Sequence, residues 1–399
     1  MRVALDAAFL GRQRGGDETW MTGLLEGLAR HRGPEDSFPL LLTGGAAPAS
    51  VDGDPAFPVV RVPARPGPWH FVVTLPAAVR RLGSPDLLLS VTHAPPAGRV
   101  PGVLVLGDLS FVHRPGDYPP ATARRLRTLV PRHVARARAV LVPSEFTRQD
   151  LLRTYDADPD RVHVVPNRIP APAALAAPEL RDAAAELAAR GVRPPYLLYL
   201  GNLHGRKNVP ALITAFRRVR RSGDLDAHRL VVAGGRWFGG SDEERAAGGD
   251  PAIVFLGRVS DAARSALYAG ADALAYPSLF EGFGLPPLEA MAHGVPVLTS
   301  SVTSLPEVCG DAALLVDPAD PAALADGVLR ILTDGPLRAR LRAAGPVRAA
   351  RFDADRVGRA ALAALHRACG SAVAAPPPGA AESASTSGHA VPTTREETS

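Results

Sequence analysis

The sequence is poor in lysine, cysteine and aromatic residues, and each scarcity excludes a class of protein. Lysine occurs once, at position 207, so 44 of the 45 basic residues are arginines. The two cysteines, Cys309 and Cys369, cannot form a disulfide framework and fit a reducing compartment. Aromatic residues make up 5% of the chain and the arginines are spread along it, which argues against nucleic-acid binding despite the net charge of +5.

Long hydrophobic runs are also missing. The N-terminal segment meets a carboxylate at Asp6, and no run of about 18 apolar residues follows anywhere. We therefore expect a cytoplasmic protein with neither a secretion signal nor a membrane-spanning helix. The chain does have size, because 399 residues, 46% of them hydrophobic, are enough for about two hydrophobic cores.

Short strand-like segments alternate with helix-length segments, which is typical of an α/β fold with parallel sheets covered by helices on both faces. The expected strands are at residues 2–5, 39–43, 87–91, 103–106, 140–142 and 162–165, and then at 196–200, 230–233, 253–256, 273–276, 295–298 and 313–316. This pattern predicts two doubly wound, Rossmann-like domains facing across a cleft, with ligands at the carboxyl ends of their strands.

Composition sets the expected domain boundaries. A linker rich in proline and alanine at 169–195, with one helix at 179–190, separates a first domain at 1–168 from a second at 196–352. A helix at 353–369 can pack back on the first domain. Residues 370–399 are mostly Ala, Pro, Ser, Thr and Glu, which bury too little apolar surface to become ordered, so we predict a disordered tail.

The segment from Tyr199 to Pro210 runs from a strand through a glycine-containing loop into a helix. Asn208 can cap that helix, and Pro210 suits its first turn. The apolar residues at helical spacing that form its buried face are Leu212, Ile213, Phe216 and Val219. Arg206 and Lys207 then lie just before a helix N-terminus, where free N–H groups favour an anion, so we interpret them as a diphosphate cradle. The spacing is not that of a Walker loop, and a solvated basic turn is the alternative.

A second segment follows an apolar strand that ends at Tyr276 and carries two carboxylates. Glycines 282 and 284 let backbone N–H groups approach a ligand, Pro287 suits a helix start, and Glu289 is expected in the first turn of that helix. Glu281 and Glu289 would bracket one strand-end crevice as acceptors for hydroxyls. A carboxylate pair also fits a glycoside hydrolase, and without a site Glu281 would be a surface loop residue and Glu289 would complement a helix dipole.

Paired glycines follow two further expected strands. Gly15 and Gly16 precede a helix with an apolar face, and their loop could touch a phosphate or sugar from across the cleft. Gly234 and Gly235 follow the strand at 230–233 but lack the spacing of a dinucleotide-binding loop. An ordinary turn is the alternative for both pairs.

Taken in order, these segments resemble the retaining, nucleotide-sugar-dependent glycosyltransferases of family 4, which have the two-domain GT-B fold. The resemblance covers about residues 1 to 368 and is most specific at Glu281-Gly-Phe-Gly-Leu-Pro-Pro-Leu-Glu289, which matches the family's E-x7-E segment. Other matching segments are Gly205-Arg-Lys-Asn, Phe255-Leu-Gly-Arg-Val-Ser, Ser304-Leu-Pro-Glu-Val, Asp108-Leu-Ser-Phe, Pro143-Ser-Glu-Phe-Thr and Val165-Pro-Asn.

The resemblance implies roles for individual residues. Arg206 and Lys207 would bind the donor diphosphate, Glu281 the hydroxyls of the donor sugar, and Glu289 the ribose; Asp108 joins the first three as a catalytic residue. The other implied donor-binding positions are Gly15, Gly16, Asn202, Gly235, Arg258, Val259, Gly282, Phe283, Gly284 and Leu285. Neither a metal nor a cofactor is implied besides the nucleotide sugar, for which GDP-mannose is our first expectation and a UDP-sugar the other. The resemblance demotes the hydrolase interpretation.

The chain departs from the family at three positions. Gly107 stands where members usually carry a histidine that faces the sugar, Asn202 where many have arginine, and Arg168 where glycine often follows Val-Pro-Asn. We expect Arg206 to supply the charge missing at position 202. Our hypothesis for the missing histidine is that His93 or His113 replaces it, and an ordinary loop histidine is the alternative for each.

We therefore expect a retaining hexosyltransferase, with mannose as the first choice, that uses a hydroxyl acceptor in glycan, glycolipid or surface-polysaccharide synthesis. The first domain would bind the acceptor and the second the nucleotide sugar. The leaving diphosphate would help to deprotonate the acceptor, so cationic charge near the leaving group matters most. Two alternatives stay open, namely a sugar-nucleotide epimerase with the same fold and a nucleotide-sugar-binding protein whose catalysis is weakened by Gly107.

One stretch, residues 121–138, has six arginines and no acidic residue. A basic helix on the acceptor domain predicts peripheral contact with the inner face of an anionic membrane and access to a lipid-linked acceptor. The alternative is a solvated face in an arginine-rich protein.

Overall fold

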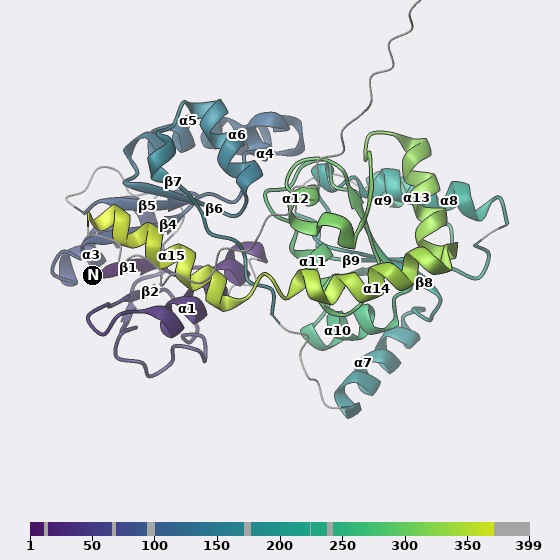
Figure 1. Ribbon diagram of the computed structural model, residues 1–399, viewed down its shortest axis with the longest axis horizontal. Helices are drawn as coiled ribbons and strands as arrows, with labels where there is room; N and C mark the ends of the chain where they lie inside the picture. Colours follow the sequence, from purple (N-terminus) through teal and green to yellow (C-terminus); the bar gives the residue numbers. More distant parts are fainter. Residues whose placement is uncertain are drawn as a thin grey trace, which may run out of the picture.

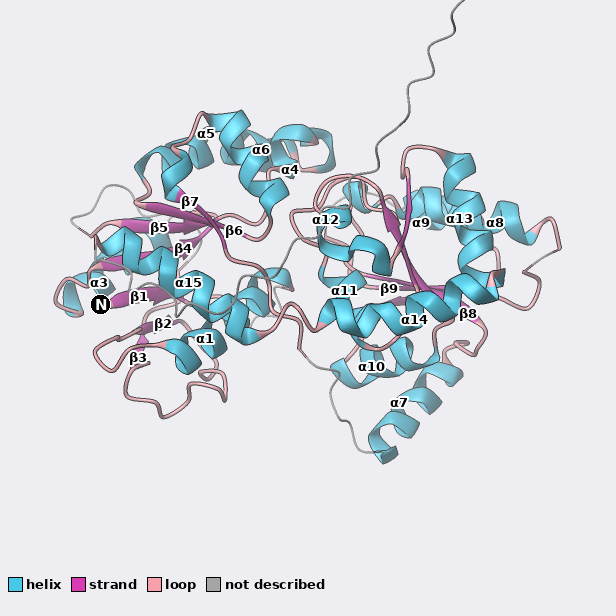
Figure 2. Cartoon of the chain, in the orientation of Figure 1, coloured by secondary structure: helices cyan, strands magenta, loops and turns pink. Residues whose placement is uncertain are grey.

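The computed structural model describes residues 1–11, 15–65, 69–93, 100–170, 177–223, 225–237 and 242–370. Within these ranges the chain forms two parallel β-sheets, which lie in two neighbouring domains and are covered by helices (Figures 1 and 2). The expected α/β class with two doubly wound domains is confirmed. No helix in the described ranges is long and apolar enough to cross a membrane. The predicted tail lies outside the described residues, except for Gly370.

The first sheet, within the described residues, has seven parallel strands in the order β3-β2-β1-β4-β5-β6-β7. These strands are β1 (Val3–Asp6), β2 (Leu40–Leu42), β3 (Val59–Arg61), β4 (Leu87–Val91), β5 (Gly102–Val105), β6 (Ala139–Val142) and β7 (Val162–Val164). The helical segments between them are α1 (Gly16–His31), η1 (His70–Thr74), α3 (Leu75–Arg81), α4 (Ser110–His113), η2 (Pro115–Asp117), α5 (Pro120–Arg136), α6 (Glu145–Tyr155) and η3 (Pro159–Arg161).

The second sheet has six parallel strands in the described ranges, in the order β10-β9-β8-β11-β12-β13. They are β8 (Tyr196–Leu200), β9 (Arg229–Ala233), β10 (Ile253–Gly257), β11 (Ala273–Tyr276), β12 (Val297–Ser300) and β13 (Leu314–Val316). The helical segments are α7 (Ala177–Ala189), η4 (Gly205–Lys207), α8 (Val209–Arg220), α9 (Asp242–Ala247), α10 (Asp261–Gly270), α11 (Leu285–Ala292), α12 (Leu305–Cys309), η5 (Gly310–Ala312), α13 (Pro321–Thr333), α14 (Gly335–Ala349) and α15 (Ala354–Cys369).

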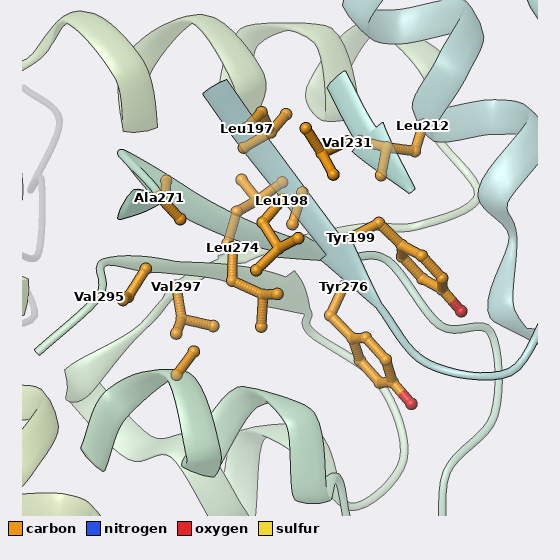
Figure 3. Close-up of a cluster of buried hydrophobic side chains, with 14 of the residues drawn as sticks. Leu197, Leu198, Tyr199, Leu212, Val231, Ala271, Leu274, Tyr276, Val295 and Val297 are labelled. Carbon is orange, nitrogen blue, oxygen red and sulfur yellow. The ribbon is translucent and has the colours of Figure 1, made fainter. Parts of the chain in front are cut away.

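The core of the second domain explains why its strands are apolar along their whole length. Figure 3 shows side chains of four neighbouring strands, among them Leu198, Val231, Leu274 and Val297, packed between helices. A central parallel strand is covered on both faces, so every position along it favours an apolar residue. Each fully buried leucine of this kind contributes about 1.5–3 kcal/mol.

Two helices pack away from their neighbours in the sequence. Helix α7 packs on α10, and its Ala183 and Leu187 are buried in the core of the second domain. Helix α15 leaves the second domain and lies along α1, where its Val357 and Leu365 are buried in the core of the first (Figure 1). The end of the described chain therefore stabilises the first domain.

All twelve expected strands are present, with ends within two residues of the predicted ones. The sequence analysis missed β3, a three-residue strand at the edge of the first sheet. Its Val59 is 41% exposed and Arg61 is exposed as well. An edge strand that faces solvent carries no buried apolar pattern, so nothing in its sequence distinguishes it from a loop.

Candidate active site at the domain interface

Strand order places the site in the second domain. The order of its sheet reverses between β8 and β11, and ligands of such sheets bind outside the carboxyl ends of these two strands. Tyr199 and Tyr276 lie at those ends and stack with their ring centroids 5.9 Å apart (Figure 3). Both rings are buried. Their hydroxyl groups contact the segment that follows β8, since Tyr199 donates to the Asn202 carbonyl at 3.0 Å and the Tyr276 hydroxyl accepts a hydrogen bond from Lys207 Nζ at 2.5 Å.

Arg206 and Lys207 lie in η4, a single 3₁₀ turn directly before α8. His204 precedes the turn, and its side chain accepts the N–H of Arg206 at 3.4 Å. Burial lowers the pKa of His204 to about 4, helped by Arg206, so the ring is neutral and can accept.

The face of α8 is buried as predicted, but the predicted cap is wrong. The four predicted apolar residues of α8 are buried. Asn208 occupies the position before the helix with a φ of 59°, whereas a capping side chain needs an extended backbone there. Its amide instead donates to the Pro318 carbonyl at 2.8 Å.

Glu281 binds both cations of the turn. Its carboxylate accepts hydrogen bonds from the Lys207 ammonium group and from Arg206 Nη1, the latter at 2.8 Å. Ser278 Oγ donates to the same carboxylate at 2.6 Å, and Lys207 Nζ also donates to the Tyr276 hydroxyl at 2.5 Å. Glu281 is 5% exposed and Lys207 8% exposed. The two alternatives of a surface glutamate and a solvated basic turn are therefore wrong.

Burial and charge set the protonation states of these groups. Burial raises the pKa of Glu281, but Arg206 and Lys207 outweigh it and lower that pKa to about 2. Burial also lowers the pKa of Lys207 to about 8, with Arg206 acting in the same direction and Glu281 opposing both. For Arg206, burial is outweighed by Glu281 and Asp108, which raise its pKa well above the usual value. At neutral pH all three groups are therefore ionised.

The first domain contributes Asp108. Its Oδ2 lies 3.6 Å from Arg206 Nη2, and its Oδ1 accepts hydrogen bonds from the N–H and the hydroxyl of Ser110, at 2.9 and 2.5 Å. Because the single hydroxyl proton of Ser110 goes to Asp108, the Tyr118 hydroxyl donates to Ser110 Oγ at 2.6 Å. The structure thus brings together the four residues predicted as catalytic, and it does so at the interface of the two domains.

The glycines of the loop after β11 allow close contacts. A β-carbon at Gly282 would lie 1.8 Å from the Gly107 carbonyl oxygen of the first domain. The Gly282 carbonyl itself accepts hydrogen bonds from the hydroxyls of Ser144 and Thr147, at 2.7 and 3.2 Å. Gly284 has a φ of 114°, which other residues rarely adopt. Both positions therefore require glycine.

Helix α11 begins at Leu285, two residues before the predicted start at Pro287. Glu289 is therefore its fifth residue, and the prediction that it lies in the first turn is wrong. Its carboxylate accepts a hydrogen bond from the Tyr268 hydroxyl at 3.0 Å. Phe283, just before the helix, is buried and packs edge-on against another phenylalanine of the second domain. Glu289 and Glu281 thus have different partners, although both follow β11.

The loop after β1 faces the start of α11. Gly15 is the residue before α1 and has a φ of 61°. A β-carbon at Gly16 would lie 3.8 Å from Leu285 Cδ1, so the N-terminus of α1 meets the second domain here. Residues 12–14 of this predicted loop lie outside the described residues.

The remaining predicted donor-binding residues follow β8, β9 and β10. Asn202 lies in the loop after β8 and is held by Tyr199. A β-carbon at Gly235 would lie 2.9 Å from Arg258 Nε, so positions 235 and 258 adjoin. Val259 packs half-buried against the core of the second domain.

Both histidines that we considered as substitutes for the histidine missing at position 107 contact other side chains. His113 Nε2 lies 2.8 Å from Asp150 Oδ1, and its ring stacks on Phe280 of the second domain at 5.3 Å. His93 packs edge-on against His133 at 5.7 Å, and burial lowers its pKa to about 4. Their role at the sugar stays a hypothesis. A β-carbon at Gly107 would meet no atom within 4 Å, so the position itself has free space.

Several residues of the interface were not singled out from the sequence. Tyr276 and Ser278 contact the ion cluster, and Tyr118 reaches it through Ser110. Glu307 of α12 accepts the backbone N–H groups of residues 145 and 146 at the start of α6, both at 2.9 Å. The position of Tyr276 at a strand end was a usable signal. For Glu307 the only signal was its place in a segment that resembles the family.

Comparisons with known proteins give matches over both domains. The family model described as Glycosyltransferase Family 4 matches residues 14–171, and the model described as Glycosyl transferases group 1 matches residues 194–334. The D-inositol 3-phosphate glycosyltransferase of Xylanimonas cellulosilytica is 30% identical over 388 residues, which span 87% of this chain and 90% of that protein.

A second relative matches over a shorter part of the chain, and a solved structure matches over most of it at lower identity. The O-antigen chain mannosyltransferase B of Escherichia coli is 34% identical over 261 residues, or 63% of this chain; the match spans 66% of that protein, just under two thirds of its length. The crystal structure of Anabaena HepE in complex with UDP-glucose has a TM-score of 0.67 at 18% identity and covers 92% of this chain and 99% of that one. At this identity the likeness shows the fold alone.

Proposed function

The chain belongs to glycosyltransferase family 4, and from this membership we propose that it transfers a hexose from a nucleoside diphosphate sugar to a hydroxyl group of an acceptor. Mannose is our first choice of sugar because the E. coli relative is named as an O-antigen chain mannosyltransferase. GDP-mannose is therefore the first donor to test, and a UDP-sugar the second because HepE was solved with UDP-glucose. The name of the E. coli relative, an O-antigen chain mannosyltransferase, also supports a role in surface-polysaccharide synthesis.

The buried pair of cations carries the proposal. Arg206 and Lys207 lie side by side at the carboxyl end of β8, and Lys207 is 8% exposed. Burying two cations costs desolvation free energy, which is offset by Glu281, bonded to both, and by Asp108, whose Oδ2 lies 3.6 Å from Arg206 Nη2. An anion with more than one charge, bound at the start of α8, would be a further favourable partner for both cations. A nucleoside diphosphate has this charge.

In the proposed reaction, the bond from the anomeric carbon to the diphosphate breaks while a bond to the acceptor oxygen forms on the same face of the sugar. The leaving diphosphate takes the acceptor proton, so the configuration is retained. Arg206 and Lys207 stabilise the negative charge that grows on the leaving group. Glu281, with its pKa near 2, is ionised at neutral pH and accepts hydrogen bonds from sugar hydroxyls instead of donating a proton.

Calorimetric titration with UDP, GDP, ADP and dTDP tests the donor site, and the nucleotide that binds restricts the list of sugars. We expect one nucleotide to bind and Lys207→Ala to weaken it at least about tenfold, the loss expected for a buried charge-assisted contact. Lys207→Ala leaves Glu281 paired with Arg206. The matched control is Arg218→Ala, which removes an exposed cation from α8. Equal affinity in Lys207→Ala and the wild type would contradict the assignment.

We also propose peripheral contact between α5 and an anionic membrane surface, which a lipid-linked acceptor would require. The helix exposes Arg124, Arg125 and Arg127, and Leu129 beside them is 36% exposed. Sedimentation with phosphatidylglycerol vesicles at low salt should carry the wild type down, and a triple Arg→Glu variant at these positions should stay in solution. Failure of the wild type to bind the vesicles would end this proposal.

A further inference from the structure

An open hollow of about 660 Å³ lies on the first domain, and none of the roles proposed for the donor uses it. Its lining includes Pro115 and Gly116 of η2, Tyr118 in the following loop, and Arg124, Arg127 and Thr128 of α5. The residues from α5 are three and four positions apart, so they lie on one face of the helix. The hollow therefore presents two arginine side chains from the same helix face.

Among the residues that the structure describes, these two arginines form no ion pair. Within the described ranges, no carboxylate lies within ion-pairing distance of Arg124 or Arg127, and both side chains are exposed. The nearest acidic residue in sequence, Asp117, accepts a hydrogen bond from Arg114 Nε at 2.6 Å. Like charges three residues apart on a helix repel each other, so a bound anion would stabilise this pair.

Tyr118 connects the hollow with the ion cluster. Its ring lines the hollow and packs edge-on against His204, with 5.0 Å between centroids, and His204 precedes the turn that carries the two donor-site cations. Burial raises the pKa of Tyr118 to about 12, so its hydroxyl stays protonated and donates to Ser110, which in turn donates to Asp108. The hollow thus adjoins the proposed reaction centre from the acceptor side.

We propose that the hollow binds a phosphate group carried by the acceptor, with Arg124 and Arg127 as its ligands. Guanidinium groups bind phosphate oxygens through paired N–H donors. Thr128 contributes no donor because its hydroxyl proton goes to the Arg124 carbonyl at 2.8 Å. This inference deepens the proposed function and rests on it, since it names the acceptor class as a sugar phosphate or a lipid-linked sugar phosphate whose free hydroxyl faces the ion cluster.

Titration with inorganic phosphate, followed by calorimetry on the full chain, tests the site. The background variant is Lys207→Ala, which removes one cation of the donor site. In this background we expect Arg124→Gln/Arg127→Gln to weaken phosphate binding about tenfold, the loss of two charge-assisted contacts at an exposed site. Arg132→Gln/Arg136→Gln removes the same charge from α5 outside the hollow and should change the affinity less than about twofold. Equal losses in the two double variants, or no phosphate binding once Lys207 is replaced, would overturn the proposal.

Titrations with two phosphate compounds distinguish the possible sources of the phosphate. Nucleotide binding then distinguishes failure of this proposal from failure of the proposed function. Mannose 1-phosphate and geranyl phosphate represent a soluble and a lipid-linked acceptor. Tighter, arginine-dependent binding of geranyl phosphate indicates the lipid-linked one, and equal binding indicates that the phosphate alone is recognised. Nucleoside diphosphate affinity should be unchanged in Arg124→Gln/Arg127→Gln. If the wild type binds phosphate here but no nucleotide, the proposed function fails while the phosphate site stands.

Discussion

At the scale of single residues, Lys207 differs from the other basic residues in the chain because it is the only lysine. Arginine bias accounts for the scarcity of lysine but not for its location. The Lys207 ammonium group bonds both Glu281 and the Tyr276 hydroxyl at a buried position, where the compact ammonium meets two acceptors from different directions. A planar guanidinium has a different donor geometry, so arginine is not equivalent here.

The lowered pKa of Lys207 gives a pH-dependent prediction. The ammonium form binds the diphosphate, and its pKa falls from the usual 10.5 to about 8, so donor binding weakens as the pH rises through that value. We expect kcat/KM for the donor, which reports the free enzyme, to decrease above about pH 8. Lys207→Arg keeps its charge and should lack this decrease, at lower activity. A wild-type profile that stays flat up to pH 10 would contradict the prediction.

Two glycines that meet at the domain interface give a matched pair of variants. Gly282→Ala places a β-carbon against the Gly107 carbonyl, whereas a β-carbon at Gly107 meets no atom within 4 Å. We expect Gly282→Ala to lower kcat by about 10²-fold, the effect of misplacing groups by about 1 Å. Gly107→Ala should retain most activity for two reasons. The added β-carbon has free space, and the backbone at position 107 does not have a positive φ. Steady-state kinetics of both variants, with circular dichroism to confirm folding, checks the pair; similar activities would exclude a steric role for Gly282.

At the scale of elements, the contact of α1 with α15 depends on two small residues. Gly27 and Gly358 face each other, and a β-carbon at Gly358 would lie 2.2 Å from the Gly27 carbonyl oxygen. The backbones of the two helices are therefore in direct contact. Beside them α15 buries Val357, Ala361 and Leu365. Small residues at the crossing let these larger ones reach the core of the first domain.

Gly358→Ala should therefore destabilise the protein, although glycine to alanine within a helix ordinarily stabilises. We expect a loss of about 1–3 kcal/mol, as for overpacking of a tight contact. Urea unfolding measures it. Gly44→Ala, at a loop glycine with no atom within 4 Å of the added β-carbon and no positive φ, should change stability by less than about 0.5 kcal/mol. Wild-type stability in Gly358→Ala would show that α15 is not tightly packed on α1.

At the scale of the whole molecule, the carboxyl ends of both sheets meet and exchange contacts. Phe280 of the second domain lies against the rings of His113 and Phe146 of the first, at 5.3 and 5.7 Å. Glu307 accepts the first N–H groups of α6, which are orphan donors of that helix, so a carboxylate of one domain caps a helix of the other. The contact between the two domains at these ends thus includes polar contacts and an aromatic cluster.

Glu307→Ala should loosen this contact between the domains without unfolding either one, because Glu307 is exposed. Loss of a helix cap costs about 0.5–2 kcal/mol, and about 1–2 kcal/mol corresponds to a factor of 5–30 in an equilibrium. We expect a larger radius of gyration by small-angle scattering and a higher donor KM. Asp326→Ala, at an exposed acid of α13, is the control. An unchanged radius together with an unchanged KM would show that the cap does not hold the domains together.

The sequence by itself determined the elements and the location of the candidate site. Strands covered on both faces are apolar along their length. Arg206, Lys207 and Glu281 lie in the segments after such strands, so the local pattern of apolar residues is enough to place them at strand ends. The errors at Asn208 and Glu289 are local too, because a left-handed residue and an early helix start change which groups the first turn presents.

Only the tertiary structure decided which of these groups meet. Lys207 and Glu281 are 74 residues apart, and Glu145 and Glu307 are 162 apart. Such contacts depend on strand order and on how the two domains face each other, which side-chain periodicity does not encode. Burial is also a tertiary property. The same lysine would be an ordinary surface cation in an isolated turn, and it becomes a buried group with a pKa near 8 because β11 and its loop pack over it.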